Sequence, residues 1–207
     1  MVKQSIFIIP TFFVFYFLNI NVSKISTENS LSRIIIPEQY STLLHLGQKD
    51  LISSITWIDL IQNSTVKKDD IPFELSRSMF ISNLSPYFYF NYKYNGTLIS
   101  IAKDQFENSN IVLKKGLKYF PDDYELLFQL GFNYYFLQNE VMKGLEVFSK
   151  IYTLKIYEGK NPTFPIIYSN IQKKIGRKKV AKQILYDLLL KTDNQNLIKV
   201  LKSKLKN

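Results

Sequence analysis

Two pairs of residues recur along this chain at one spacing. Pro86 and Pro121 are 35 residues apart, and so are Gly96 and Gly131, each of which follows its proline by ten residues. A period of roughly 20 to 50 residues is typical of folds in which one supersecondary unit stacks on the next. Apolar residues recur three and four apart, as from Leu51 to Ile61, and no stretch alternates over several strands. The sequence therefore predicts an all-α chain of stacked helical units.

The residues around these positions resemble the tetratricopeptide repeat, a helical hairpin with a period of about 34 residues. Its pattern of large apolar, Leu-Gly, Tyr, small, aromatic and Pro residues appears in two copies and more weakly in a third, over about Pro86 to Asp193. The resemblance implies a solenoid of helical hairpins over residues 86–207, closed by a basic C-terminal capping helix. An unrelated helical bundle is the alternative. The matching residues are Tyr92, Asn95, Gly96, Ile99, Ser109, Leu113, Gly116 and Pro121, then Leu127, Leu130, Gly131, Tyr134, Gly144 and Phe148, then Gly176, Ala181 and Leu185.

The N-terminal region contains a long apolar run. Residues 5–22 carry no charge. As a helix they would extend about 27 Å, close to the roughly 30 Å hydrocarbon core of a bilayer. Because no small residues suited to signal-peptide cleavage follow, we expect residues 1–23 to be a membrane anchor, with a signal segment or a buried core helix as alternatives. Residues 24–37 are predicted to be a linker and residues 38–85 an N-terminal helical region. The bulk of the chain is expected to be extracytoplasmic, on the periplasmic side.

The composition excludes several kinds of chemistry. Cysteine is absent and His45 is the only histidine, which excludes disulfides, thiol nucleophiles and zinc sites built from cysteine and histidine. Phosphate-loop, dinucleotide-binding and zinc-protease motifs are also absent. The carboxylate pairs at 69–70 and 122–123 lie near prolines at predicted helix boundaries, where acidic residues stabilise helix N-termini. We therefore expect a noncatalytic protein with no cofactor and no metal.

The resemblance also implies a binding groove, because the first helix of each tetratricopeptide hairpin lines a concave surface. Some family members clamp a peptide carboxylate with Lys and Asn, but Phe128 and Phe132 occupy those positions here. Aromatic residues favour an apolar or helical segment as the ligand. The alternative is that they form the core between repeats. The candidate groove residues are Phe90, Lys93 and Thr97, then Phe128, Phe132, Tyr135 and Phe136, then Ile166, Asn170 and Lys173.

Positive charge is concentrated at the C-terminal end. Residues 166–207 hold eleven basic and two acidic residues, a balance of +9 out of the total of +10. A capping helix with a solvated outer face accounts for most of these residues. The alternatives are binding to anionic lipid, to an acidic protein or to nucleic acid. Nucleic acid is disfavoured, since no aromatic residue is interleaved with the basic residues from Lys173 to Lys182. The candidates for an anionic surface are Lys174, Arg177, Lys178, Lys179 and Lys182.

The order of these features resembles bacterial envelope proteins that carry tetratricopeptide repeats behind an N-terminal membrane anchor. A single apolar segment precedes a Leu-Gly helix that contains Trp57, and the repeats follow. The resemblance implies a noncatalytic protein–protein interaction scaffold whose partner is a secretion, pilus or flagellar component. The alternative function is binding of an anionic membrane surface or acidic partner through the basic C-terminal helices.

Overall fold

The computed structural model describes residues 47–63, 73–102 and 104–206. All regular structure in these residues is helical, which confirms the prediction of an all-α chain. The predicted anchor, the linker and His45 lie outside the described residues, as does the carboxylate pair at 69–70. None of the described helices is long and apolar enough to cross a membrane.

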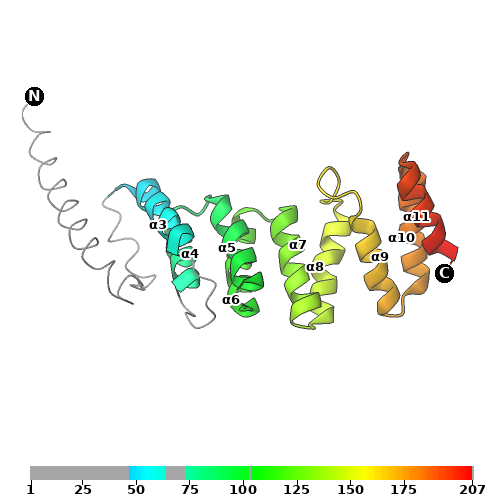
Figure 1. Ribbon diagram of the computed structural model, residues 1–207, viewed down its shortest axis with the longest axis horizontal. Coiled ribbons are helices and arrows are strands. Elements are labelled where there is room, and N and C mark those ends of the chain that lie inside the picture. The colour runs from blue at the N-terminus through cyan, green and yellow to red at the C-terminus, as the bar shows by residue number, and fades with distance from the viewer. Residues whose placement is uncertain (1–46, 64–72, 103, 207) are drawn as a thin grey trace, which may run out of the picture.

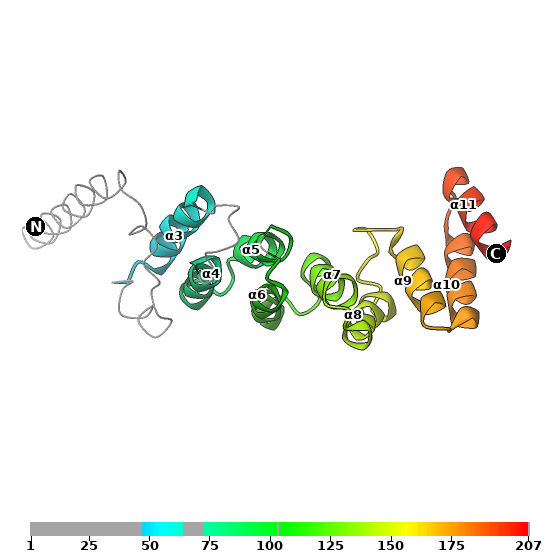
Figure 2. The same ribbon diagram turned by 60° about the horizontal axis from the view of Figure 1, so that its bottom comes forward.

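The helices follow one another as hairpins arranged in a row (Figure 1). Helix pairs α3–α4, α5–α6, α7–α8 and α9–α10 form the hairpins, and α11 packs against α10. Figure 2 shows α3, α5 and α7 in one layer and α4, α6 and α8 in a second. The row is therefore solenoid-like. The bounds are α3 Lys49–Asn63, α4 Phe73–Leu84, α5 Tyr89–Ile101, α6 Phe106–Tyr119, α7 Tyr124–Phe132, the π-helical turn η2 Asn133–Leu137, α8 Val141–Thr153, α9 Phe164–Lys174, α10 Lys178–Lys191 and α11 Gln195–Lys206.

Glycine lies where the two helices of a hairpin approach closely. A Cβ atom on Gly96 of α5 would be 2.5 Å from Leu113 of α6, and one on Gly131 of α7 would be 2.7 Å from Phe148 of α8. The two glycines are 35 residues apart, and so are the two side chains that they meet. The spacing in the sequence thus corresponds to two equivalent helix crossings.

The hairpin of α9 and α10 achieves its close contact with other small residues. Ser169 Oγ of α9 donates a hydrogen bond of 2.9 Å to the backbone oxygen of Ala181 in α10. Ser109 Oγ of α6 makes the corresponding bond of 2.6 Å to the backbone oxygen of Gly96. Gly176 lies in the turn between α9 and α10 with φ +86°, a conformation that favours glycine. Serine and alanine therefore replace glycine at this crossing.

Buried apolar side chains join successive hairpins. One cluster, which includes Tyr92, connects α5, α6 and the α7–η2 segment, and another, which includes Phe148 and Phe164, connects α7–η2 with α8, α9 and α10. A smaller cluster around Leu60 and Ile81 connects α3 with α4. Because α7 contributes to both large clusters, the hairpins from α5 to α10 share a continuous core.

Buried amides add polar contacts between hairpins. Asn91 of α5 donates a hydrogen bond of 2.9 Å to Ser82 Oγ of α4. Asn133 of η2 accepts a hydrogen bond of 2.6 Å from Ser100 Oγ of α5 and donates one of 2.8 Å to Ser109 Oγ of α6. A buried amide without partners is costly, so these bonds favour one alignment of neighbouring hairpins over others.

Candidate partner-binding surface

Three groove candidates form a row of rings along α7 and η2. The centroids of Phe128 and Phe132 are 6.5 Å apart in a stacked arrangement, and those of Phe132 and Phe136 are 5.0 Å apart. Residues four apart lie on the same face of a helix, which accounts for the row. Phe128 and Phe132 are partly buried, whereas Phe136 is 50% exposed. The row therefore leads from the core to the surface.

The prediction that Tyr135 faces the groove is wrong. Its side chain is only 6% exposed, and its ring centroid is 6.2 Å from that of Phe148. Its backbone is so close to α8 that a Cβ atom on Gly144 would be 2.9 Å from the Tyr135 Cα. Burial raises the pKa of the Tyr135 phenol. The residue belongs to the core.

Tyr135 lies within the π-helical turn η2. The amide of Gln138 donates a hydrogen bond of 2.9 Å to the carbonyl of Asn133, five residues earlier instead of four. Tyr135 follows Gly131 by four residues, so both lie on the face that packs against Phe148 of α8. Such turns occur frequently at functional sites.

Helix α5 presents a second aromatic pair. Phe90 and Tyr94 are stacked with centroids 5.9 Å apart, and their side chains are 52% and 54% exposed. Phe90 was predicted from the sequence but Tyr94 was not, although Tyr94 lies four residues later on the same helical face. These two rings form an exposed aromatic patch on the first layer of helices.

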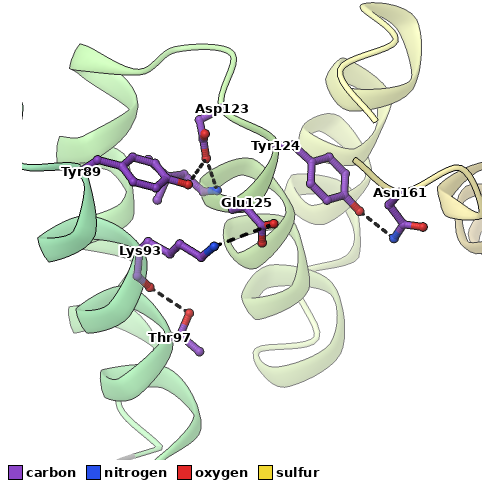
Figure 3. Close-up of polar contacts among 8 residues, drawn as sticks. Tyr89, Lys93, Thr97, Asp123, Tyr124, Glu125 and Asn161 are labelled. Atoms are coloured by element: carbon purple, nitrogen blue, oxygen red, sulfur yellow. Dashed lines mark hydrogen bonds and ion pairs between the residues drawn. The ribbon is translucent and has the colours of Figure 1, made fainter. Parts of the chain in front are cut away.

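The remaining two candidates of α5, Lys93 and Thr97, make polar contacts (Figure 3). Lys93 Nζ lies 4.0 Å from a carboxylate oxygen of Glu125 on α7. Thr97 Oγ1 donates a hydrogen bond of 2.9 Å to the backbone oxygen of Lys93. Lys93 therefore links α5 to α7, while the Thr97 hydroxyl is used within its own helix.

An apolar cavity of about 380 Å³ lies between α3 and α5. Its volume falls within the roughly 300 to 1,000 Å³ of typical ligand pockets. The Trp57 and Tyr94 ring centroids are 6.2 Å apart at this cavity. This cavity was not predicted from the sequence, because its walls come from different hairpins. The lining residues are Trp57, Leu60 and Ile61 of α3 and Tyr94, Asn95 and Leu98 of α5.

The third-copy candidates belong to a different surface. Asn170 and Lys173 are exposed and line a cavity shared by α9, α10 and α11, whereas Ile166 is partly buried. Lys178 and Lys182 of the predicted anionic surface line the same cavity. The structure therefore divides the predicted groove into an aromatic part and a basic part.

The other residues of the predicted anionic surface lie outside that cavity. Lys174 Nζ is 5.6 Å from the centroid of the Tyr135 ring, in a cation–π arrangement. Arg177 and Lys179 are exposed and do not line the cavity. The basic candidates thus form no single site.

The carboxylates at 122–123 have structural partners. Asp123 caps α7 by accepting a hydrogen bond of 2.9 Å from the Leu126 amide, and it accepts another of 3.1 Å from the Tyr89 hydroxyl (Figure 3). Asp122 forms an ion pair of 3.1 Å with Lys150. Burial, together with the charge of Asp123, raises the pKa of Tyr89 well above its ordinary value. The capping role predicted for this pair is confirmed for Asp123.

Another cavity, of about 460 Å³, is bordered by α8, α9 and α10. Tyr152, Tyr157 and Asp187 are among its lining residues, and Asp187 is its one carboxylate. Burial raises the pKa of both phenols. Within the residues that the structure describes, no group of three or more metal-ligating side chains lies close enough to hold an ion. The cavity offers aromatic surface and hydrogen bonds.

A scan against protein-family models gives no match, and comparisons with curated proteins and with solved structures give none either.

Proposed function

We propose that this chain is a noncatalytic scaffold that holds an apolar helical segment of a partner protein on α3, α5 and α7. The observation that carries the proposal is the apolar cavity between α3 and α5, with the exposed rings of Phe90 and Tyr94 on α5. Large aromatic side chains dominate the energetics of many interfaces, because they bury much surface with few rotatable bonds. An exposed aromatic patch beside a cavity is therefore a suitable place for a partner's anchor residue.

A helical ligand fits this surface better than an extended one. Extended peptides bind most readily to sheet edges, whereas an amphipathic helix lays its apolar face along a groove between helices. The cavity of about 380 Å³ would take one or two large apolar side chains of such a helix. The partly exposed row of Phe132 and Phe136 on the next hairpin offers further apolar surface. The Lys93–Glu125 ion pair supplies the polar rim that interfaces of this kind have.

The sequence resemblance supports a wider context for this proposal. On this proposal the hairpins are tetratricopeptide-like and the chain belongs to a bacterial cell-envelope assembly, with a secretion, pilus or flagellar component as its partner. Residues 5–22 would anchor the scaffold in the membrane, with the helices on the periplasmic side. The equivalent crossings at Gly96 and Gly131 favour repeated hairpins over an unrelated bundle.

Trp57 provides a direct test, because it is the only tryptophan in the chain and it lines the cavity. Amphipathic helical peptides would be selected from a display library against the full-length chain. Binding of a selected peptide is expected to shift the Trp57 emission to shorter wavelength, since an apolar side chain would displace water from the indole. Fluorescence anisotropy of the labelled peptide gives its affinity.

A matched pair of variants distinguishes binding at this surface from nonspecific binding to exposed aromatic residues. Tyr94 on α5 and Tyr186 on α10 are 54% and 50% exposed. Tyr94→Ala is expected to weaken peptide binding about tenfold, the effect of losing an aromatic anchor, whereas Tyr186→Ala leaves it unchanged. The proposal fails if both substitutions weaken binding equally, or if the Trp57 emission does not respond to any bound peptide.

A further inference from the structure

A second cavity, of about 270 Å³, lies where α9, α10 and α11 meet. Its walls come from three helices, so residues distant in the sequence converge there. Lys173 of α9, Lys178 and Lys182 of α10 and Lys204 of α11 are among the residues that line it. Asn170 adds an exposed amide. This cavity is separate from the aromatic surface described above.

Among the residues that the structure describes, no Asp or Glu lines this cavity. Asp187, the acidic residue of α10, lines the neighbouring cavity and accepts a hydrogen bond of 2.8 Å from Gln183. In the part of the chain that the structure describes, none of the four lysines forms an ion pair with a carboxylate. Their mutual repulsion is therefore not offset by an acidic side chain.

The start of α10 adds to this positive potential. Lys178 is the first residue of the helix, and the N-cap residue Arg177 makes no side-chain capping hydrogen bond. No acidic residue occurs in the first turn. The partial positive charge of a helix N-terminus is usually balanced by an acidic side chain or a bound anion. Here the lysines of the same turn increase it.

We propose that this cavity binds a small phosphate-bearing ligand, a phosphomonoester or a diphosphate. A multiply charged anion would offset several of the four lysines at once, which a single carboxylate cannot do. Ammonium groups bind phosphate as point charges without demanding a planar geometry. The volume of about 270 Å³ admits such a group and is small for a folded macromolecule. Two sources share this chemistry, namely a free phosphorylated metabolite and the headgroup of a phosphorylated lipid.

The site consists of particular lysines, whereas a diffuse basic surface would include every basic residue of the region. Lys204 belongs to it although the sequence offered no reason to choose that lysine. Arg177 and Lys179 lie outside it although they belong to the same run of charge. The proposal therefore predicts that position matters more than total charge.

The experiment compares two double variants of equal charge in the full-length chain. Lys182→Gln with Lys204→Gln removes one cavity lysine from α10 and one from α11. Lys179→Gln with Lys199→Gln removes one exposed lysine from each of the same helices, neither of which lines the cavity. Isothermal titration measures binding of pyrophosphate at low ionic strength, and circular dichroism verifies that each variant is folded. Soluble dihexanoyl phosphatidic acid, with dihexanoyl phosphatidylcholine as its control, tests the lipid source.

The cavity variant is expected to bind its probe about tenfold more weakly than the wild type, while the matched variant changes by less than about twofold. This pattern with pyrophosphate supports a free phosphate ligand, and the same pattern with phosphatidic acid alone supports a lipid headgroup. Equal losses in the two variants would show a diffuse electrostatic effect and overturn the proposal. Absence of binding to either phosphate probe would overturn it as well.

Discussion

Alanine in place of Gly131 perturbs the closest contact between α7 and α8. The added Cβ atom would lie 2.7 Å from one carbon of the Phe148 ring and within 3.1 Å of two more. The Phe148 side chain is fully buried, and the rings of Phe128 and Phe164 lie 5.9 and 6.0 Å from it. The ring therefore has little space into which it can move.

Two opposing effects decide the sign of the change. Alanine stabilises a helix interior by about 1 kcal/mol relative to glycine. Overpacking of a filled core costs about 1 to 3 kcal/mol. Because the clash is with a buried ring between other rings, we expect overpacking to exceed the gain. The free energy of unfolding should fall by about 1 kcal/mol, which lowers the melting temperature by roughly 2 to 4 °C in a chain of this size.

Urea unfolding followed by far-ultraviolet circular dichroism measures this change. A double-mutant cycle with Phe148→Leu identifies its cause. The smaller leucine should accommodate the new methyl group, so that Gly131→Ala becomes neutral or stabilising, with a coupling energy of about 1 to 2 kcal/mol. If Gly131→Ala stabilises the wild-type chain by about 1 kcal/mol, helix propensity alone is acting and the close crossing is refuted. If the stability changes of Gly131→Ala and Phe148→Leu were additive, the close contact between these two residues would be refuted as well.

Three further predictions concern individual polar groups. Asn133→Ala leaves Ser100 Oγ in the core without the acceptor that lies 2.6 Å from it. The free energy of unfolding, measured with urea, should therefore fall by about 2 kcal/mol. An unchanged midpoint of urea unfolding would contradict the role of this amide. Asp123→Ala should cost about 1 kcal/mol through loss of the α7 cap, measured by thermal unfolding, whereas Asp123→Asn should lose little because asparagine also caps helices. Burial raises the pKa of Tyr92 to about 12 from 10.0, and absorbance titration of wild type against Tyr92→Phe measures it. The phenol ionises at lower pH in the unfolded chain than in the folded one. The contribution of Tyr92 to the free energy of unfolding is therefore complete below pH 10 and declines as the pH rises toward 12. A contribution that persists beyond pH 12 would contradict this direction of the pKa shift.

The repeat was predictable because close contacts between helices require small residues at fixed positions in the sequence. A position that allows no side chain must be glycine or another small residue, and this requirement recurs whenever the same crossing recurs. Gly96 and Gly131 therefore appear in the sequence at the spacing of the hairpins. The α9–α10 crossing was harder to recognise, because Ser169 and Ala181 serve the same purpose and are common in any helix.

The direction of side chains was less predictable where it was taken from the family resemblance. Tyr135 and Phe136 are adjacent in the π-helical turn, yet one is 6% exposed and the other 50%. The resemblance to tetratricopeptide repeats placed both in the groove, although Tyr135 follows the buried Gly131 by about one helical turn. Only the hydrogen bond from Gln138 to Asn133 reveals that the helix widens there.

The amino-acid sequence alone determined that the chain is helical, that two hairpins repeat with a spacing of 35 residues, and that its C-terminal end is strongly basic. These properties depend on residues close in sequence or on composition. The tertiary structure decided which side chains share a cavity. Trp57 and Tyr94 line one cavity, and Lys173 and Lys204 line another, only because separate helices bring them together. The packing of one helix on another depends on interactions distributed over many residues, so the position of each pocket emerges only when the chain is folded.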